Sequence, residues 1–271
     1  CARDAANVMK CWGGTGIAST SDITTGAATA GLEVRNVVVG YDHACALQPS
    51  GIPKCWGKRT NGQLGDGLTA GSTPTPTIFP LPGISATALA VTAGGTCVVT
   101  DTNELYCAGA RARIGLGSGA DITTPLQVPG ASGATDVAMG PTHGCVILTS
   151  GRMACWGTGT SGQLGDGTST TSGTPVLVKN IGEDFDIFDL PKAIDLAVGE
   201  SHTCAVLADG RVACWGLNNY GQLGTGTKID EDRPAIVSGI SNAVEVAAGG
   251  AMTCALLSTG TVQCWGINAR G

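Results

Sequence analysis

The stretch Cys204-Ala-Val-Leu-Ala-Asp-Gly-Arg-Val-Ala-Cys214 decides the fold. Apolar residues on both sides of an Asp-Gly pair are typical of two short strands joined by a tight turn. Gly210 lies four places before the second cysteine, and a left-handed glycine at this point suits a three-residue hairpin loop. In that register Leu207 lies opposite Arg211, so Cys204 lies directly opposite Cys214. Opposed residues have Cα atoms about 4.5–5.5 Å apart, which is within the range of a disulfide.

The same ten-residue spacing occurs six times and uses all 12 cysteines of the chain. The turn position holds only Gly or Asn in every copy. We number the copies as repeats 1 to 6 and predict one disulfide within each hairpin. The predicted pairs are Cys1 with Cys11, Cys45 with Cys55, Cys97 with Cys107, Cys145 with Cys155, Cys204 with Cys214, and Cys254 with Cys264.

Other interpretations of the cysteines fit the spacing less well. A zinc site needs four ligands at short spacings, whereas each hairpin offers two thiols. Reduced structural thiols would not need partners in register. Cys1 is also compatible with the lipid-bearing cysteine of a bacterial lipoprotein. Disulfides imply an oxidising compartment, so we expect an extracellular or cell-surface protein.

The flanking residues extend each hairpin into a longer repeat. An apolar stretch and a Gly precede most first cysteines, as in Ile194 to Gly199. Trp-Gly follows five second cysteines, and Gly-Gln-Leu-Gly then occurs at 62–65, 162–165 and 221–224. A segment such as Thr174 to Val178 supplies a further strand. First cysteines lie 44–59 residues apart, and four-stranded repeats of roughly 40–50 residues are typical of β-propeller blades.

These motifs resemble the repeats of the regulator of chromosome condensation family, and the resemblance spans essentially the whole chain. It implies an all-β fold, a β-propeller of four-stranded blades of about 50 residues. The family usually has seven blades, and six repeats are visible here. Repeat 3 departs most, because it lacks the histidine before Cys97 and has Ala108 in place of the tryptophan. We therefore expect blade 3 to pack less regularly.

Residues 1–271 are predicted to form a single β-propeller domain that is truncated at both ends. The chain opens inside a repeat, without a preceding strand or signal peptide, and it stops where Gln222 would follow in repeat 5. Three arrangements remain open: a shortened ring, a ring completed by further chain, and a ring closed by a strand of a partner.

Composition limits the partners that the chain is expected to bind. The net charge is −6, with 15 Lys plus Arg against 21 Asp plus Glu. Nucleic-acid binding needs a concentrated basic surface, which this balance does not supply. No apolar run approaches the ~18 residues that span a membrane. The chromatin binding known in the family is therefore not transferred to this chain.

Catalytic patterns are absent from the sequence. His43, His143 and His202 occupy one equivalent position in three repeats, which predicts a structural role in separate blades. The chain contains no nucleophile elbow, no phosphate-binding loop and no H-E-x-x-H metal motif. The exchange-factor activity known in the family needs a nuclear partner in a reducing compartment, which the disulfides argue against. We expect no catalytic residues, no metal and no cofactor.

The irregular segments are the best candidates for binding, because propeller loops carry function on a rigid scaffold. The insertion at 182–190 contains the predicted partner-binding residues Asp184, Phe185, Asp186 and Phe188. It is also compatible with a solvated insertion, or with a calcium site formed by Asp184, Asp186 and Asp189. The loop at 71–78 is rich in Ser, Thr and Pro, which is typical of O-glycosylation or of an extended linker.

We therefore predict an exported, non-enzymatic interaction or structural module that acts in surface adhesion or as a subunit of an extracellular assembly. Its partner would be another protein or a second copy of the chain. The alternative is a proteinaceous inhibitor of a secreted enzyme, since one bacterial member of this fold class inhibits a β-lactamase. Such inhibitors need many aromatic anchors, and only 4% of residues here are aromatic. An enzyme is the third possibility.

Overall fold

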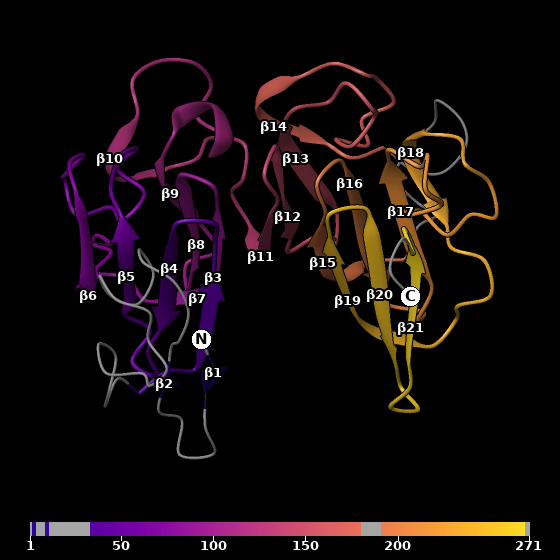
Figure 1. Ribbon diagram of the computed structural model, residues 1–271, viewed down its shortest axis with the longest axis horizontal. Coiled ribbons are helices and arrows are strands. Elements are labelled where there is room, and N and C mark those ends of the chain that lie inside the picture. The colour runs from indigo at the N-terminus through magenta and orange to yellow at the C-terminus, as the bar shows by residue number, and fades with distance from the viewer. Residues whose placement is uncertain (1, 4–8, 11–32, 180–190, 269–271) are drawn as a thin grey trace. The chain divides into compact units, whose positions relative to one another are not determined.

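The computed structural model describes residues 2–3, 9–10, 33–179 and 191–268. It divides into two compact units, residues 1–137 and 138–271. Both units consist of antiparallel strands that follow one another in chain order, so each sheet is a simple meander (Figure 1). We number the blades after the repeats.

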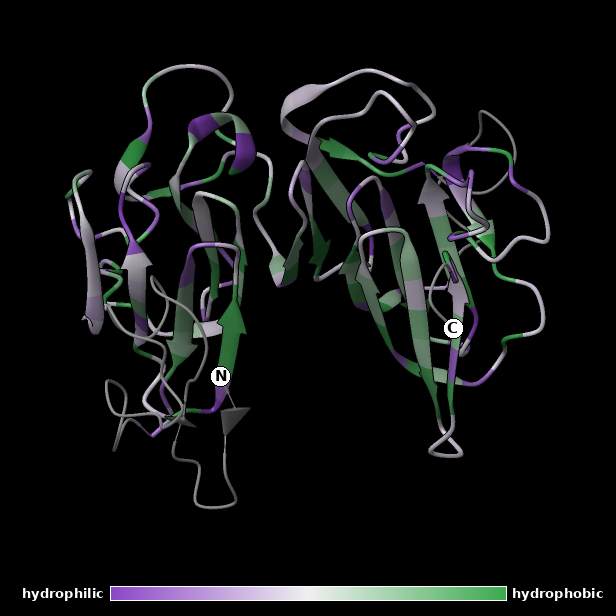
Figure 2. Ribbon diagram, in the orientation of Figure 1, coloured by the Kyte–Doolittle hydropathy of each residue, from purple (hydrophilic) through white to green (hydrophobic). Residues whose placement is uncertain are grey.

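The first unit contains blades 2 and 3 and a short strand pair, β1 with β2. Blade 3 is a four-stranded sheet like blade 2, so the departures of repeat 3 do not disturb its strand order. The 3-10 helix η1, Arg111–Arg113, follows β9 and is purple in Figure 2. The strands are β1 Ala2–Arg3, β2 Met9–Lys10, β3 Asn36–Val39, β4 His43–Leu47, β5 Pro53–Lys58, β6 Ser72–Ile78, β7 Ala86–Thr92, β8 Gly95–Thr100, β9 Leu105–Gly109 and β10 Ile122–Gln127.

The second unit contains blades 4, 5 and 6. Strand β11 of blade 4 contains the point of division itself. Blade 6 has three strands among the described residues. The strands are β11 Ala134–Met139, β12 His143–Leu148, β13 Met153–Gly157, β14 Ser172–Leu177, β15 Ala193–Val198, β16 His202–Leu207, β17 Val212–Gly216, β18 Glu231–Ile236, β19 Ala243–Gly249, β20 Met252–Leu257 and β21 Val262–Gly266.

The hairpins have the register that the sequence predicts. In blade 5, Cys204 pairs with Cys214 and Val206 pairs with Val212. The turn residue has positive φ in every described hairpin, because the three-residue loop needs a left-handed residue there. The φ values are 80° for Gly51, 61° for Asn103, 80° for Gly151, 82° for Gly210 and 83° for Gly260.

The two central strands of blades 2 to 5 are largely buried, whereas β21 of blade 6 has no buried residue and the outer strands are largely exposed. Every residue of β13, β16 and β17 is buried, and blades 4 and 6 pack on the two sides of blade 5 within the second unit. The outer strand β6 has no buried residue. Figure 2 accordingly shows the hydrophobic residues gathered in the strands and the hydrophilic ones mainly in the loops.

The segment at 71–78 is a strand and not the loop that the sequence predicts. Ser72–Ile78 forms β6, the outer strand of blade 2. Pro76 fits because it lies in the irregular stretch of the pairing with β5, between the partners of Cys55 and Gly57. Outer strands tolerate proline at such positions. The equivalent prolines of the other outer strands are Pro125, Pro175 and Pro234.

The cores lie between neighbouring blades and include the disulfides of blades 2, 4 and 5. One core in the first unit joins residues of blades 2 and 3, among them Cys45, Leu64 and Phe79. Two cores in the second unit join blade 4 to blade 5 and blade 5 to blade 6. Many of the residues that recur from repeat to repeat therefore lie in the contacts between blades.

Candidate functional site

Five of the six predicted cysteine pairs form disulfides between the central strands of one blade. Their Cα atoms are 4.0–4.2 Å apart, closer than the sequence predicts. The Leu207 amide donates to the Arg211 carbonyl, and hydrogen-bonded and non-bonded pairs alternate along the strands. Cys204 and Cys214 therefore form a non-hydrogen-bonded pair, where Cα atoms approach most closely. Cys1 and Cys11 lie outside the described residues.

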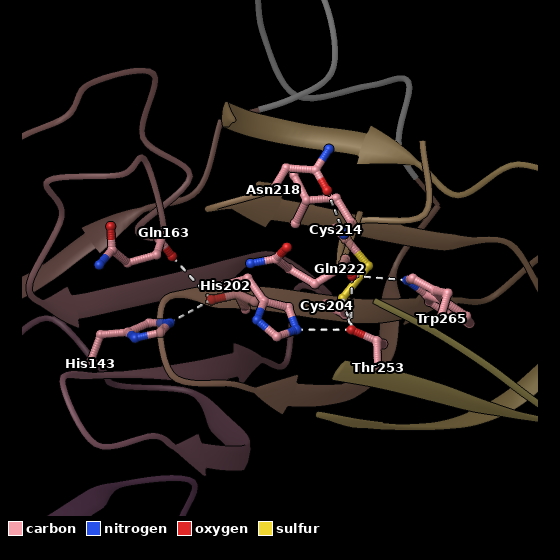
Figure 3. Close-up of a disulfide and its surroundings, with 11 residues drawn as sticks. His143, Gln163, His202, Cys204, Cys214, Asn218, Gln222, Thr253 and Trp265 are labelled. Atoms are coloured by element: carbon pink, nitrogen blue, oxygen red, sulfur yellow. Dashed lines mark hydrogen bonds between the residues drawn. A yellow bond between two sulfur atoms is a disulfide. The ribbon is translucent and has the colours of Figure 1, made fainter. Parts of the chain in front are cut away.

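A buried histidine connects each of three blades to a threonine of the next blade. The histidine Nε2 lies 2.8 Å from the threonine Oγ1 in all three cases, and Figure 3 shows two of these histidines. Both side chains are at most 1% exposed. The pairs are His43 with Thr96, His143 with Thr203, and His202 with Thr253.

The threonine hydroxyl also donates to a backbone carbonyl of the preceding blade. The acceptor is the glutamine of Gly-Gln-Leu-Gly: Gln63 for Thr96 at 2.8 Å, Gln163 for Thr203 at 3.0 Å, and Gln222 for Thr253 at 2.9 Å. A hydroxyl has only one hydrogen, so its oxygen accepts the hydrogen bond from the histidine. Each of these histidines therefore carries a proton on Nε2.

Burial keeps the two histidines of the second unit neutral. It lowers the pKa of His143 to about 3, with a smaller contribution from His202 nearby. Burial likewise lowers the pKa of His202 to about 4. These rings act as fixed hydrogen-bond donors at neutral pH.

The tryptophan of Cys-Trp-Gly binds the same glutamine carbonyl. Trp215 Nε1 donates to Gln163 O at 3.0 Å. Gly165 makes room for the ring, because a Cβ on this glycine would lie 2.7 Å from the indole nitrogen. Its φ of 69° also favours glycine. The same arrangement recurs with Trp265, Gln222 and Gly224.

The glutamine side chain shapes the loop that presents this carbonyl. Its Oε1 accepts from the backbone amide two residues earlier, at Asn61, Ser161 and Tyr220, over 2.8–2.9 Å. Gly-Gln-Leu-Gly is thus a socket that receives the threonine of the next blade, together with its tryptophan at 162–165 and 221–224. The motifs that recur most regularly in the sequence therefore serve to pack one blade against the next.

Asp42, His43 and Thr96 resemble a catalytic triad but lack its access to substrate. Asp42 Oδ1 lies 3.4 Å from His43 Nδ1, and the hydrogen bond with His43 lowers the pKa of this carboxyl. However, His43 and Thr96 are both 0% exposed, and the threonine hydrogen is donated to Gln63. Blades 4 and 5 have the same His–Thr pair without the acid. The trio therefore serves blade packing.

Repeat 3 compensates for its missing tryptophan within the same core. Ala108 stands at the tryptophan position, and Phe79 stands where blades 4 and 5 have Val178 and Val237. Phe79 is 0% exposed, and a Cβ on Gly65 would lie 2.6 Å from its ring. Phe79 thus fills the space that the indole of Trp215 fills beside Gly165. The sequence does not show this exchange, because the two residues lie in different repeats.

Some of the most exposed large side chains lie at one end of their own blade. In a meander, the turn after the first strand and the loop after the third strand lie at the same end, which we call the long-loop end. It carries Tyr41, 88% exposed, and Leu68, 52% exposed, in blade 2. It carries Tyr220, 51% exposed, and Ile229, 68% exposed, in blade 5.

The loop that carries Tyr220 and Ile229 is held in one shape by Asn218. This side chain is 0% exposed, and its Nδ2 donates to the carbonyls of Thr227 and Ile229 at 3.1 and 3.0 Å. Its Oδ1 accepts from the Leu223 amide at 3.0 Å. The exposed residues of this loop are therefore ordered before any partner binds.

The predicted partner-binding residues Asp184, Phe185, Asp186 and Phe188, and the alternative calcium site at 184–189, lie outside the described residues. Within the described part of the chain, no three His, Cys, Asp or Glu side chains are grouped so that they could hold a metal ion. No helix in the same part is long and apolar enough to cross a membrane.

Two family models match the chain, both described as Regulator of chromosome condensation (RCC1) repeat. One matches residues 150–206 and 209–256, and the other matches 134–163, 193–222 and 243–271. Together they cover the second unit.

Curated relatives extend the similarity into the first unit. The Ultraviolet-B receptor UVR8 of Arabidopsis thaliana is 30% identical over 211 residues, 76% of this chain and 46% of the receptor. The E3 ubiquitin-protein ligase HERC2 of Mus musculus is 29% identical over 238 residues, 82% of this chain and 5% of the ligase. The chain therefore spans less than half the length of these relatives.

Solved structures agree with the fold. Prp20p from Saccharomyces cerevisiae matches with a TM-score of 0.71 at 25% identity, over 86% of this chain and 57% of that one. Human WBSCR16 matches with a TM-score of 0.73 at 24% identity, over 83% and 58%. Both agree with the predicted all-β propeller. The repeated Gly-Gln-Leu-Gly sockets, the matched models and these relatives lead to one conclusion: the chain belongs to the regulator of chromosome condensation (RCC1) repeat family.

Proposed function

We propose that this chain is an exported, non-enzymatic module that binds another protein through the long-loop end of its blades. One observation carries the proposal. The repeated His, Thr and Gln side chains and Trp215 are buried between blades, whereas Tyr220 and Ile229 are exposed at the long-loop end of blade 5, and Tyr41 at that of blade 2. Surface adhesion and extracellular assembly are the two roles that such a module would serve.

The disulfides support an oxidising compartment. Cys45, Cys55, Cys145 and Cys155 are 0% exposed and lie in the cores between blades. Such bonds form before or during folding, in compartments that do not keep thiols reduced. A cell-surface or extracellular location follows as part of the proposal.

The chemistry of the long-loop end suits a protein partner. Tyrosine offers a large contact area at a small cost in side-chain entropy, and it is enriched in binding surfaces. The loop fixed by Asn218 loses little further freedom on binding, which favours affinity. Prp20p, a similar structure, is described by its binding to Gsp1p and histones. Protein binding is therefore a use that this blade architecture supports.

The outer rim of the blades is a poorer candidate for assembly. Each described outer strand, β6, β10, β14 and β18, contains a proline at the equivalent position. Proline lacks the amide that a joining strand would need, and it protects sheet edges from pairing with other chains. Partners would thus bind by side chains at the long-loop end.

The test is quantitative capture of partners from extracts of the native cell surface. Tyr220→Ser combined with Ile229→Ser should remove the partners that the wild-type chain retains, without changing Tm. The matched control is Ile78→Ser combined with Leu177→Ser, which alters equally exposed residues of outer strands. Loss of partners in the control variant, or full retention in the long-loop variant, would overturn the assignment of the surface.

A further inference from the structure

The two junctions between blades of the second unit bring an indole close to a disulfide. At the junction of blades 4 and 5, Trp215 Nε1 lies 3.0 Å from Gln163 O, and the same carbonyl lies 3.0 Å from Thr203 Oγ1. Thr203 Oγ1 in turn lies 3.9 Å from Cys145 Sγ. Three short steps therefore join the indole nitrogen to the Cys145–Cys155 bond.

The junction of blades 5 and 6 repeats this arrangement, which Figure 3 shows. Trp265 Nε1 and Thr253 Oγ1 both lie 2.9 Å from Gln222 O. Thr253 Oγ1 lies 3.7 Å from Cys204 Sγ. Each tryptophan also packs in the same apolar core as the disulfide of the preceding blade. Water and other electron acceptors are thus kept away from the buried indole of Trp215.

Indole and disulfide are a reactive pair when the indole absorbs light. An excited indole is a strong electron donor, and a disulfide accepts an electron into its antibonding S–S orbital. We propose that light absorbed by Trp215 and Trp265 cleaves the Cys145–Cys155 and Cys204–Cys214 disulfides. The inference is independent of the proposed binding function, because it concerns only these buried junctions.

The step balances without an external oxidant or reductant. One electron passes from the indole to the disulfide, and the S–S bond breaks into one thiolate and one thiyl radical. The indole radical cation releases its Nε1 proton, and the thiolate takes up a proton. The products are a neutral indolyl radical, one cysteine thiol and one cysteinyl radical, so electrons and protons are conserved.

The hydrogen bonds at the junction assist the separation of the two sulfur atoms. The hydroxyl hydrogen of Thr203 can turn from Gln163 O towards a thiolate at Cys145. His143 Nε2–H continues to donate to the threonine oxygen meanwhile, at 2.8 Å. Gln163 O keeps the hydrogen bond from Trp215. A hydrogen bond to the ionised sulfur is stronger than one to a neutral disulfide, so it slows re-formation of the bond.

The first unit contains a natural control. Thr96 Oγ1 lies 3.5 Å from Cys45 Sγ and 2.8 Å from His43 Nε2, so the polar part of the site is complete. Ala108 replaces the indole, and the phenylalanine beside it, Phe79, absorbs weakly and is a poor electron donor. A tryptophan follows the second cysteine of all three disulfides directly, as Trp56, Trp156 and Trp215, with its side chain on the opposite face of the strand, so this neighbour does not distinguish them. The Cys45–Cys55 bond lacks the second indole, so light should cleave it less than the Cys145–Cys155 and Cys204–Cys214 bonds.

The experiment irradiates the folded, oxidised chain at wavelengths that indole absorbs and tyrosine does not, with iodoacetamide present. Peptide mapping without reduction then measures alkylation of each cysteine, against a sample kept in the dark. We expect more alkylation at Cys145, Cys155, Cys204 and Cys214 than at Cys45 and Cys55. Equal alkylation of the three disulfides would overturn the proposal.

Variants assign the electron donor. Trp215→Phe should reduce alkylation of Cys145 and Cys155 to the level of Cys45 and Cys55, and leave Cys204 and Cys214 unchanged. Persistence of alkylation in this variant would show that another chromophore cleaves the bond. Trp265→Phe should have the complementary effect at Cys204 and Cys214, so the test survives if one variant does not fold.

A gain of sensitivity provides the stricter test. The double variant Phe79→Val with Ala108→Trp places the residues of the second unit at the junction of blades 2 and 3. It should make Cys45 and Cys55 as sensitive as Cys145 and Cys155. A folded double variant whose Cys45–Cys55 bond is still cleaved less than the Cys145–Cys155 bond would refute the role of the indole.

Discussion

The junction of blades 2 and 3 and the junction of blades 4 and 5 fill the same space with different residues. The first uses Phe79 with Ala108, and the second uses Val178 with Trp215. In each case one large ring and one small side chain meet beside a glycine of Gly-Gln-Leu-Gly. The large ring belongs to the preceding blade in the first unit and to the following blade in the second.

The comparison shows which features of the repeat are required and which can be exchanged. The histidine, the threonine and the glutamine carbonyl are present at both junctions with the same distances, within 0.2 Å. The ring can come from either side of the junction, because packing depends on filled volume and not on which strand supplies it. The indole N–H is the one polar group that the exchange removes.

The largest expected effect is common to both units. Closing a hairpin of about eleven residues should contribute roughly 2.5–3 kcal/mol per disulfide in the chain-entropy model. Several bridges together rival the ~5–15 kcal/mol net stability of a typical domain. Complete reduction should therefore lower Tm severely in thermal unfolding experiments.

Paired removals compare the two units directly. Cys45→Ala with Cys55→Ala, and Cys145→Ala with Cys155→Ala, should cost similar free energies of unfolding, since the two loops have equal length. An unchanged Tm after complete reduction would show that the disulfides are dispensable. A large difference between the paired variants would show that strain or packing, and not loop closure, sets their contribution.

The next effect tests the exchange of rings. Phe79→Val alone should cost roughly 2–4 kcal/mol, because it leaves a cavity beside Gly65 and Ala108. Ala108→Trp alone should also destabilise, because Phe79 already occupies the space. The double variant should recover most of the loss, giving a coupling of up to about 3 kcal/mol in a double-mutant cycle followed by urea unfolding. Additive costs would contradict the exchange.

The sequence predicts the hairpin well because its signals are local. The spacing of Cys204 and Cys214 and the glycine at 210 lie within one turn, and the structure has the predicted register and positive φ. The Cα separations are shorter than predicted, because the cysteines occupy a non-hydrogen-bonded pair, where opposed Cα atoms lie closest. Which pairs along the hairpin are hydrogen-bonded depends on the hydrogen bonds of its loop.

The contacts between blades were harder to predict because they join different repeats. The equivalent positions of His43, His143 and His202 predicted a structural role, but not the threonine partner. The sequence nevertheless contains a signal for this partner. Wherever one repeat has the histidine, the next repeat has a threonine directly before its first cysteine: Thr96, Thr203 and Thr253. The 182–190 prediction lies outside the described residues and stays a prediction, as do the domain limits and the compartment.

Acid should destabilise the second unit through its buried neutral histidines. His143 and His202 have folded-state pKa values of about 3 and about 4, against 6.5 for the ordinary side chain. Below 6.5 the unfolded chain binds protons that the folded chain does not, so stability is lost as pH falls. Each histidine should reduce the folding equilibrium by about a factor of ten per pH unit, until the pH reaches its folded pKa.

Urea unfolding across this pH window measures the slope. His202→Gln should remove the contribution of one proton and retain a side chain that can donate to Thr253. If the slope between pH 6.5 and about 4 is the same in His202→Gln and wild type, the ring is not a buried neutral group.

The smallest effect concerns the indole N–H that the exchange of rings removes. Thr203→Val deletes the acceptor of His143 Nε2–H and one donor to Gln163 O, but Trp215 still donates to that carbonyl. It should cost about 1–2 kcal/mol.

Thr96→Val in the first unit should cost about 1 kcal/mol more, because Ala108 offers no donor and the carbonyl of Gln63 loses the hydroxyl on which it depends. The Thr-to-Val replacement changes the side-chain volume equally at both sites, as the comparison requires. A Thr→Ser variant at each site, which keeps the hydroxyl, should recover most of the lost stability. Equal costs at the two junctions would mean that the indole contributes volume alone. A larger cost at Thr96 would show that the exchange of rings preserved packing at the expense of one hydrogen bond.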